Sequence, residues 1–312
     1  TEGGPSATPE IPLDPAPPPP PPFTMSPPPT PPAPVDPLAP ADPLAAQPGD
    51  LVADRFEILA RRGEGSSGTA FVVKDVERQE SKPAILKIAK NDAAARRLDV
   101  EADVLRTLRH PRIVALTEGP IDLGTRRALL LTDAGSETLS DRIDREGRAT
   151  IGELQSFGTD LLDLATYLDT HGIFHRDIKP ANFGITKDSK SGKRRLTVFD
   201  FSLARESLDN TGSGTRGYLD PYLGRGARSR YDRAAELWSV SATLFELATG
   251  EVPWWGAGSA PAGPTDPAVV SPEAFEQSVS SRLVPFFTKA LAPDAKRRFG
   301  SVDELRTAWV DV

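Results

Sequence analysis

Short runs of apolar residues predict strands in the part of the chain that follows residue 50. Apolar side chains fill most of residues 56–59, 70–73 and 84–88, and each run is short enough for a strand. The spacing changes in residues 92–109, where a helix is predicted because apolar residues recur every three or four positions: Leu98, Ala102, Leu105 and Leu108. Pro111 then ends this helix.

Helical patterns dominate the later part of the chain. Residues 236–247 form a strongly apolar helix that Gly250 and Pro253 bring to an end. Two further helices are predicted around residues 285–287 and 308–309. We expect the aromatic residues of this part to pack in a core rather than to bind a ligand: Trp238, Phe245, Trp254, Phe286, Phe287 and Trp309.

The first 50 residues differ in composition from the rest. They hold 20 of the 32 prolines and six acidic residues without a lysine or arginine, so they carry −6 of the formal net charge of −7. Proline lacks an amide proton and has a fixed φ, so we predict an acidic, Pro-rich, disordered linker over residues 1–50. A docking peptide for a PxxP-reading domain is the alternative, disfavoured because a basic residue that would orient it is absent.

Composition excludes several classes of protein. The chain has no cysteine, so it has neither a disulfide scaffold nor a thiolate metal site. Residues 51–312 are nearly neutral, which argues against direct nucleic-acid binding, and no apolar run approaches the roughly 18 residues of a membrane span. The chain starts at Thr1 without the features of a signal peptide, so we expect a cytoplasmic protein and a piece or processed product of a longer one.

Gly63, Gly65 and Gly68 form a candidate phosphate-binding loop. Glycine allows a tight turn whose amide N–H groups can approach phosphate oxygens. The loop is predicted between two strands, which is typical of a kinase glycine loop, whereas a dinucleotide-binding loop would be followed by a helix. A glycine-rich hairpin without a ligand is the alternative.

Lys87 interrupts the apolar run of residues 84–88. A buried ammonium is costly unless it meets an anion, and both phosphate oxygens and the carboxylate of Glu101, beside the apolar stripe of the predicted helix, would serve. The alternative is that Lys87 reaches solvent from an edge strand and that Glu101 is a solvated helix residue.

The segment H-R-D-I-K-P-A-N at residues 175–182 carries the strongest signal in the chain. Together with D-F-S at residues 200–202, it resembles the H-R-D-x-K-P-x-N and D-F-G patterns of the eukaryotic-type protein kinases. The resemblance covers nearly all of residues 54–309, because the glycine loop, the lysine, the helix glutamate and these two segments keep the family's order and spacing. The Lys-Pro form of the loop is the one seen in serine/threonine kinases.

The resemblance implies roles for the charged residues in phosphoryl transfer. Asp177 would orient the substrate hydroxyl and accept its proton, and Lys179 would neutralise the transferring phosphoryl group. Asn182 and Asp200 would hold Mg²⁺ through oxygen ligands, which suit this hard cation.

The same resemblance places ATP between the glycine loop and the catalytic segment. Lys87, oriented by Glu101, would bind the α- and β-phosphates of ATP. The resemblance implies nucleotide-binding residues in several separate segments of the chain: Gly63, Gly65, Gly68, Ala70, Ile85, Lys87, Asn182 and Asp200.

The residues between Asp200 and Pro221 resemble a kinase activation segment. Thr215 would lie beside Asp177, a placement associated with serine and threonine substrates. Three residues before it are called here the activation-segment hydroxyls: Ser207, Thr211 and Ser213. A regulatory phosphate on one of them could pair with Arg176, whereas hydroxyls that are merely solvated are the alternative.

Several residues depart from the family pattern. Ser202 replaces a glycine, and Glu236 replaces the aspartate at the start of the central helix, which leaves its bond to the catalytic loop in doubt. Tyr222 replaces a glutamate that normally pairs with an arginine, here Arg298, which is left with another partner or none.

Three further departures lie where the family encloses adenine. Ala70 replaces a valine and Ile85 an alanine, so the roof exchanges a large and a small residue, while Gly184 replaces a leucine and removes apolar surface from the floor. We expect Ile85 to compensate for Ala70 so that nucleotide still binds, and we expect a double-mutant cycle with Ala70→Val and Ile85→Ala to be non-additive.

The fold implied by the resemblance is the bilobal α+β fold of the protein kinases, in a domain of residues 51–312. A five-stranded antiparallel sheet and the Glu101 helix would form the small lobe over residues 51–133, and helices the large lobe over residues 134–312. The implied activity is ATP- and Mg²⁺-dependent transfer to serine or threonine of a protein. A pseudokinase that acts as a nucleotide-binding or docking module is the alternative, favoured by the altered adenine pocket and Ser202.

Shorter motifs narrow the resemblance. Residues 199–204, 218–221 and 286–291 resemble those of kinase domains in bacterial phage-growth-limitation (BREX-type) defence proteins. In those large polypeptides the kinase is one module among several. The resemblance therefore implies other domains or subunits of a defence system as partners, reached through the Pro-rich linker.

Overall fold

The computed structural model describes residues 42–310, apart from residues 66, 79–81, 189–190, 225–227 and 257. Most of the predicted linker lies outside the described residues. The strands are β1 (Leu51–Val52), β2 (Phe56–Glu64), β3 (Thr69–Asp75), β4 (Ala84–Ile88), β5 (Leu116–Asp122), β6 (Arg127–Leu131), β7 (Phe183–Lys187) and β8 (Arg194–Val198). The α-helices are α1 (Asp92–Thr107), α2 (Leu139–Glu146), α3 (Ile151–Thr170), α4 (Arg233–Thr249), α5 (Gln277–Ala290) and α6 (Val302–Val310). Short 3₁₀ helices are η1 (Pro43–Ala45), η2 (Pro180–Asn182), η3 (Pro272–Ala274) and η4 (Ala295–Arg297).

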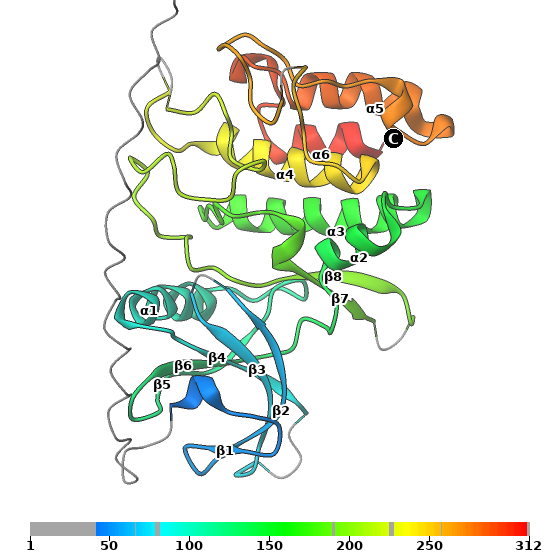
Figure 1. Cartoon of the computed structure of the whole chain (residues 1–312). Helices are drawn as coiled ribbons and strands as arrows, with labels where there is room; N and C mark the ends of the chain where they lie inside the picture. The colour runs from blue at the N-terminus through cyan, green and yellow to red at the C-terminus, as the bar shows by residue number, and fades with distance from the viewer. Residues whose placement is uncertain are drawn as a thin grey trace, which may run out of the picture. The chain divides into compact units, whose positions relative to one another are not determined.

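The small lobe is an antiparallel sheet with α1 packed beside it (Figure 1). The strand order is β1-β2-β3-β4-β6-β5. The predicted bilobal α+β fold is therefore confirmed, with one difference in the sheet. A sixth, two-residue strand is added because the chain reverses at Ala53 and Asp54, both with positive φ, and pairs Leu51 with Glu57.

Helix α1 packs into an apolar cluster that extends from β6 of the small lobe into the large lobe. Asn91 caps its first turn by accepting a hydrogen bond from the Ala94 amide, and the helix ends at Thr107 because Leu108 is extended. Leu98 and Ala102 are fully buried, in the apolar cluster that continues into the large lobe. The predicted stripe thus faces a core that both lobes share.

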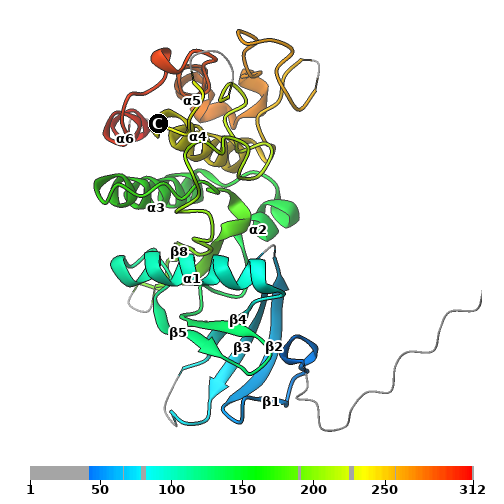
Figure 2. The ribbon, with the colours of Figure 1, turned by 90° about the vertical axis from the view of Figure 1, so that its left-hand side faces the viewer.

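The large lobe is built on α3 and α4, which lie beside each other. Helix α6 packs mainly against α3, and α5 packs against α4 (Figure 2). Helix α4 starts from the Asp232 side chain and stops at Gly250, which has the left-handed φ of 84° that favours glycine. Trp238 and Phe245 on this helix are fully buried, as predicted. Within the described residues, no helix is both long and apolar enough to span a bilayer.

Residues 42–50, which composition assigned to the linker, pack against the small lobe. Pro43 is buried, and the Asp42 carboxylate pairs with Arg126 at 2.9 Å. The Gly49 amide donates to the carbonyl of Ile58 at 2.8 Å. Packing of the chain on the sheet therefore begins before Leu51.

Candidate active site

A cavity of about 450 Å³ lies between the two lobes. Its lining comes from β2, β3, β4, α1, the segment after β6, and the loops before β7 and after β8. All the residues predicted to bind ATP or Mg²⁺ or to take part in phosphoryl transfer line this cavity: Gly63, Gly65, Gly68, Ala70, Ile85, Lys87, Glu101, Asp177, Lys179, Asn182 and Asp200. Gly184, predicted on the floor of the adenine site, does not line it. Segments more than 100 residues apart in the sequence thus meet around one space.

The glycine loop is the turn between β2 and β3, the strand–loop–strand arrangement that was predicted. The Gly65 amide donates to the carbonyl of Gly68 at 2.8 Å. Gly68 requires its glycine, because a Cβ there would lie 2.3 Å from the carbonyl oxygen of Ile88. A Cβ at Gly63 or Gly65 would meet nothing within 4 Å, so this side of the loop has open space for a ligand. Ser66 lies outside the described residues.

Lys87 joins two carboxylates from distant segments. Its Nζ lies 2.6 Å from Glu101 Oε2 and 3.0 Å from Asp200 Oδ1. Glu101 is fully buried and the Lys87 side chain is only 12% exposed. Both residues are therefore buried partners rather than solvated side chains.

Burial and charge act against each other in this cluster. Burial by itself would lower the pKa of Lys87, but the carboxylates of Asp200 and Glu101 raise it above its ordinary value. For Asp200 the two effects have the opposite signs. Burial by itself would raise the pKa of this carboxyl, but the Lys87 ammonium lowers it to about 2. The pKa of Glu101 is raised, because its burial outweighs the attraction of Lys87. At neutral pH the cluster therefore holds an ammonium and an ionised Asp200.

The catalytic loop gathers three polar side chains on Asp177. The Thr215 hydroxyl donates to Asp177 Oδ1 at 2.7 Å, and Lys179 Nζ lies 2.8 Å from Oδ2. The Asn182 amide also donates to Oδ2, at 3.0 Å, and Lys179 Nζ donates to Thr215 Oγ1 at 2.6 Å. Both oxygens of Asp177 are thus held in place, one beside a hydroxyl and one beside a cation.

The predicted metal ligands offer suitable oxygens. The Asn182 side-chain nitrogen donates to Asp177. Its Oδ1 accepts no hydrogen bond from the described residues. Asp200 meets Lys87 and the Ser202 amide through Oδ1. A carboxylate and an amide oxygen that line the same cavity fit the oxygen ligands that Mg²⁺ prefers.

Glu236 binds the catalytic loop despite replacing an aspartate. Its carboxylate accepts hydrogen bonds from the amides of His175 at 2.7 Å and Arg176 at 3.2 Å, and from the Tyr231 hydroxyl. The bond that the sequence left in doubt is therefore present.

Ser202 occupies a backbone conformation that does not need glycine. Positive φ falls instead on Asp200, at 66°, while Ser202 has no positive φ. Phe201 between them is fully buried and packs against the His175 ring at 4.6 Å. Asp200 consequently points toward Lys87 with serine in the third position.

Arg176 is bound to the main chain of the activation segment. Its Nη1 donates to the carbonyls of Glu206 at 2.7 Å and Ser207 at 2.8 Å, and its Nη2 donates to the carbonyl of Asn210. The guanidinium also lies 4.3 Å from the centre of the Tyr231 ring. Both Nη atoms of Arg176 thus donate to carbonyl oxygens of this segment, while its buried Nε has no hydrogen-bond partner among the described residues.

Arg298 finds another carboxylate in place of the missing glutamate. Its guanidinium donates two hydrogen bonds to Asp220, at 2.6 and 3.1 Å, and both side chains are buried. It also lies over the rings of Trp238 and, at 5.8 Å, Tyr222. Asp220 thus supplies the charge that Tyr222 lacks.

Gly184 lies against the chain that joins the lobes and is not part of the cavity lining. A Cβ at Gly184 would lie 2.0 Å from the carbonyl oxygen of Ala134. Glycine at this position therefore allows the backbone of Gly184 to approach that of Ala134 closely. The other two departures near the predicted adenine site, Ala70 and Ile85, both line the cavity.

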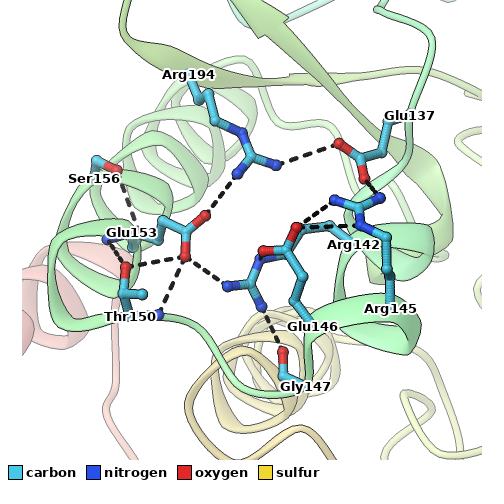
Figure 3. A network of polar contacts seen from close by, with 9 residues as sticks. All are labelled: Glu137, Arg142, Arg145, Glu146, Gly147, Thr150, Glu153, Ser156 and Arg194. Carbon is cyan, nitrogen blue, oxygen red and sulfur yellow. Dashed lines mark hydrogen bonds and ion pairs between the residues drawn. The ribbon is translucent and has the colours of Figure 1, made fainter.

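Residues 132–138, called here the hinge segment, are fixed at their far end by ion pairs (Figure 3). Glu137 pairs with Arg145 and, at 3.3 Å, with Arg194. Arg194 also reaches Glu153 at 2.9 Å, and the buried Arg142 reaches Glu153 at 2.6 Å. The network ties the hinge segment to α2, α3 and β8.

Four charged residues that line the cavity were not assigned to the site from the sequence: Arg62, Glu64, Asp133 and Asp141. Arg62 precedes the first glycine of the loop and Asp133 lies in the hinge segment, and they pair at 2.7 Å. The one signal in the sequence was the place of Arg62, which directly precedes the predicted glycine loop.

Comparison with known proteins identifies relatives of this arrangement. A family model described as the protein kinase domain matches residues 56–310. The chain is 37% identical to the probable kinase PglW of Streptomyces coelicolor, over 84% of this chain and 19% of that protein. It is 28% identical to the probable serine/threonine-protein kinase PknB of Lactococcus lactis and 27% identical to the serine/threonine-protein kinase PknB of Mycobacterium tuberculosis, each over 84% of this chain. The chain spans less than half the length of each of these relatives. The family predicted from the motifs is confirmed.

Proposed function

Because the chain belongs to the protein kinase family, we propose that it transfers the γ-phosphoryl group of ATP to serine or threonine hydroxyls of a protein substrate. The observation that carries this proposal is the meeting of Lys87, Asp200 and Asp177 around one cavity. Phosphoryl transfer depends on positioning and on charge neutralisation, which these residues are arranged to provide.

In the proposed reaction, Asp177 acts on the substrate hydroxyl. Asp177 Oδ1, which accepts the Thr215 hydroxyl in this structure, is the oxygen that we assign to the substrate. The substrate oxygen bonds to the γ-phosphorus while the bond from that phosphorus to the β–γ bridging oxygen breaks. The proton of the hydroxyl passes to Asp177, and ADP leaves.

Two lysines and Mg²⁺ would neutralise the negative charge of the reactants. Lys179 lies beside Asp177 and would face the transferring group, and Lys87 would hold the α- and β-phosphates. Asn182 and Asp200 would hold Mg²⁺, which when bound supplies charge neutralisation between the phosphates.

The similarity to the probable kinase PglW supports a further proposal about context. Together with the short motifs shared with phage-growth-limitation proteins, it favours a kinase module within a larger bacterial defence polypeptide. The other domains of that polypeptide would then be its partners.

The proposed activity is tested with labelled ATP, Mg²⁺ and a generic protein substrate. Wild type is compared with Asp177→Asn and Lys87→Met, and the exposed Lys193→Met serves as the matched control for the lysine. Label transfer by wild type and by Lys193→Met, lost in the other two, is the expected result. No transfer and no ATP-dependent rise in melting temperature would reject the proposal. A rise without transfer would favour a nucleotide-binding pseudokinase.

A further inference from the structure

Lys90, two residues before α1, pairs with the glycine loop and has no part in the proposed reaction. Its Nζ lies 2.5 Å from Oε1 of Glu64, the residue between Gly63 and Gly65. Glu64 lines the cavity, whereas Lys90 does not. The loop that we propose binds phosphates therefore carries a carboxylate, and a lysine from another segment holds that carboxylate.

The charge of Glu64 matters because the phosphates of a nucleotide are anionic. An unpaired carboxylate in this loop would repel them. In the structure, two cations bind it: Lys90 at Oε1, and Arg61 at Oε2 with a distance of 2.8 Å. The hydrogen bond from Lys90 is the largest cause of a lowered pKa of Glu64. Glu64 is thus ionised at neutral pH, with both of its oxygens bound to cations.

The two cations differ in what they connect. Arg61 and Glu64 belong to the same strand, β2, so their pair joins no distant parts of the chain. Lys90 follows β4, and the end of this strand also borders the other side of the loop. A Cβ at Gly68 would lie 2.3 Å from the carbonyl oxygen of Ile88. The chain around the end of β4 therefore contacts both ends of the glycine loop.

The main chain of Lys90 is held in turn by Arg126. The Nη1 of Arg126 donates to the Lys90 carbonyl. Arg126 lies in the turn between β5 and β6, where its own carbonyl accepts the Leu123 amide at 2.8 Å. Its guanidinium also donates to both carboxylate oxygens of Asp42, at 3.1 and 2.9 Å. The surroundings of Lys90 therefore include a residue that precedes the whole sheet.

Residues 42–46 are docked on the small lobe by more than this ion pair. Pro43 is buried, and Leu44 and Ala46 pack against the apolar cluster that includes Phe56 and Leu130. This cluster is separate from the one that α1 joins. Apolar burial therefore holds the segment in place and brings Asp42 to Arg126.

We propose that Lys90 is a positioning residue of the glycine loop, and that the docked residues 42–46 set nucleotide affinity by holding Lys90 in place. While Lys90 is paired, the Glu64 carboxylate is kept away from the phosphates. Undocking of residues 42–46 would loosen this pair and lower the affinity for ATP. The proposal rests on the proposed function, because it requires that the loop binds the phosphates of ATP.

The test measures binding to the full 312-residue chain by calorimetry, with Mg·ADP and with adenosine. Adenosine lacks phosphates, so it reports general damage to the cleft, whereas the difference between the two ligands reports on the glycine loop. Melting temperatures without ligand show that each variant is folded. The variants are Lys90→Met, Lys90→Arg, Glu64→Gln, Asp42→Asn, and Lys90→Met combined with Glu64→Gln.

Two control variants separate positioning from a change of charge. Arg61→Met removes a cation from Glu64 and leaves the contact with Lys90 intact. Lys74→Met removes an exposed lysine of β3 that does not line the cavity. A loss that exceeds both controls therefore belongs to the position of Lys90.

We expect Lys90→Met to weaken ADP about three- to fivefold, the effect of one largely exposed ion pair, and to leave adenosine unchanged. Lys90→Arg should keep most of the affinity, because it can still pair with Glu64. In the Glu64→Gln background, Lys90→Met should cause no further loss, since the carboxylate is already gone. Asp42→Asn should weaken ADP about twofold, because it acts only through the main chain of Lys90.

The controls should change less. Arg61→Met should weaken ADP by less than Lys90→Met does, and Lys74→Met should change neither affinity. These results together would assign the effect to the contact between Lys90 and the glycine loop.

Four results would overturn the proposal. If Lys90→Met weakens adenosine as much as ADP, its role is structural. If Arg61→Met costs as much as Lys90→Met, only the charge around Glu64 matters. If the combined variant loses more affinity than Glu64→Gln alone, Lys90 does not act through Glu64. If Asp42→Asn binds ADP like wild type, residues 42–46 do not set the affinity.

The same measurement separates this proposal from the proposed function. In all four cases wild type still binds ADP, so the proposed function stands. If wild type binds no ADP, the proposed function and the role of Lys90 fail together.

Discussion

Replacing Glu236 by alanine is expected to destabilise the protein by about 3 kcal/mol. The Glu236 carboxylate accepts the amides of His175 and Arg176 and the hydroxyl of Tyr231. A buried donor left without an acceptor costs about 1–3 kcal/mol, so the two amides together give about 2–6 kcal/mol. The lower half of this range applies because Glu236 is only partly buried and water can reach part of the gap.

Thermal unfolding measures this effect directly. For a domain of this size, about 1 kcal/mol shifts the melting temperature by about 2–4 °C, so we expect a fall of about 6–12 °C. Glu251→Ala is the control, because Glu251 is an exposed glutamate just beyond the same helix. Glu236→Asp should fall between Glu236→Ala and wild type, since its carboxylate is one methylene shorter. A Glu236→Ala variant that melts with wild type would show that Glu236 does not hold the catalytic loop.

The other predictions concern the activation segment, the hinge and the lysine cluster. Changing all the activation-segment hydroxyls to alanine should leave kinase activity within about twofold of wild type, because carbonyl oxygens already bind Arg176; loss of activity in the kinase assay would contradict this. Gly184→Ala should lower stability by about 1–3 kcal/mol in urea unfolding, since its Cβ meets the Ala134 carbonyl, whereas Gly212→Ala, with open space around it, should cost much less. The pKa of Lys87 is raised above its ordinary 10.5 despite burial, so its stabilising contribution is complete below pH 10.5 and is lost as pH rises through the folded-state pKa. In melting curves against pH, Lys87→Met should lose this alkaline decline, and an unchanged decline would refute it.

Local signals allowed the main elements to be predicted. The bounds of helix α1 were predicted to within two residues, because the apolar stripe that indicates this helix lies in residues close together in the sequence. The end of α4 was predicted for the same reason, since only glycine takes the conformation at Gly250 readily. The charged residues of the site could be predicted as a group because their order matches that of a known family.

Contacts between distant residues could not be predicted in this way. Arg62 and Asp133 are 71 residues apart, and the bulge that turns Arg62 into the cleft leaves no mark in the hydrophobic pattern. The Asp220 partner of Arg298 was likewise hidden, because nothing in a single sequence says which carboxylate replaces a missing one. The close contact of Gly184 with Ala134 depends on the hinge path, which only the folded chain defines.

The packing of residues 42–50 has a practical and a mechanical consequence. A fragment cut at Leu51 would lose Asp42 and its bond to Arg126, and Arg126 in turn donates to the carbonyl of Lys90. Lys90 pairs with Glu64 in the glycine loop. A force applied at Asp42 would thus reach the glycine loop, which we propose binds the phosphates of ATP, through three consecutive contacts.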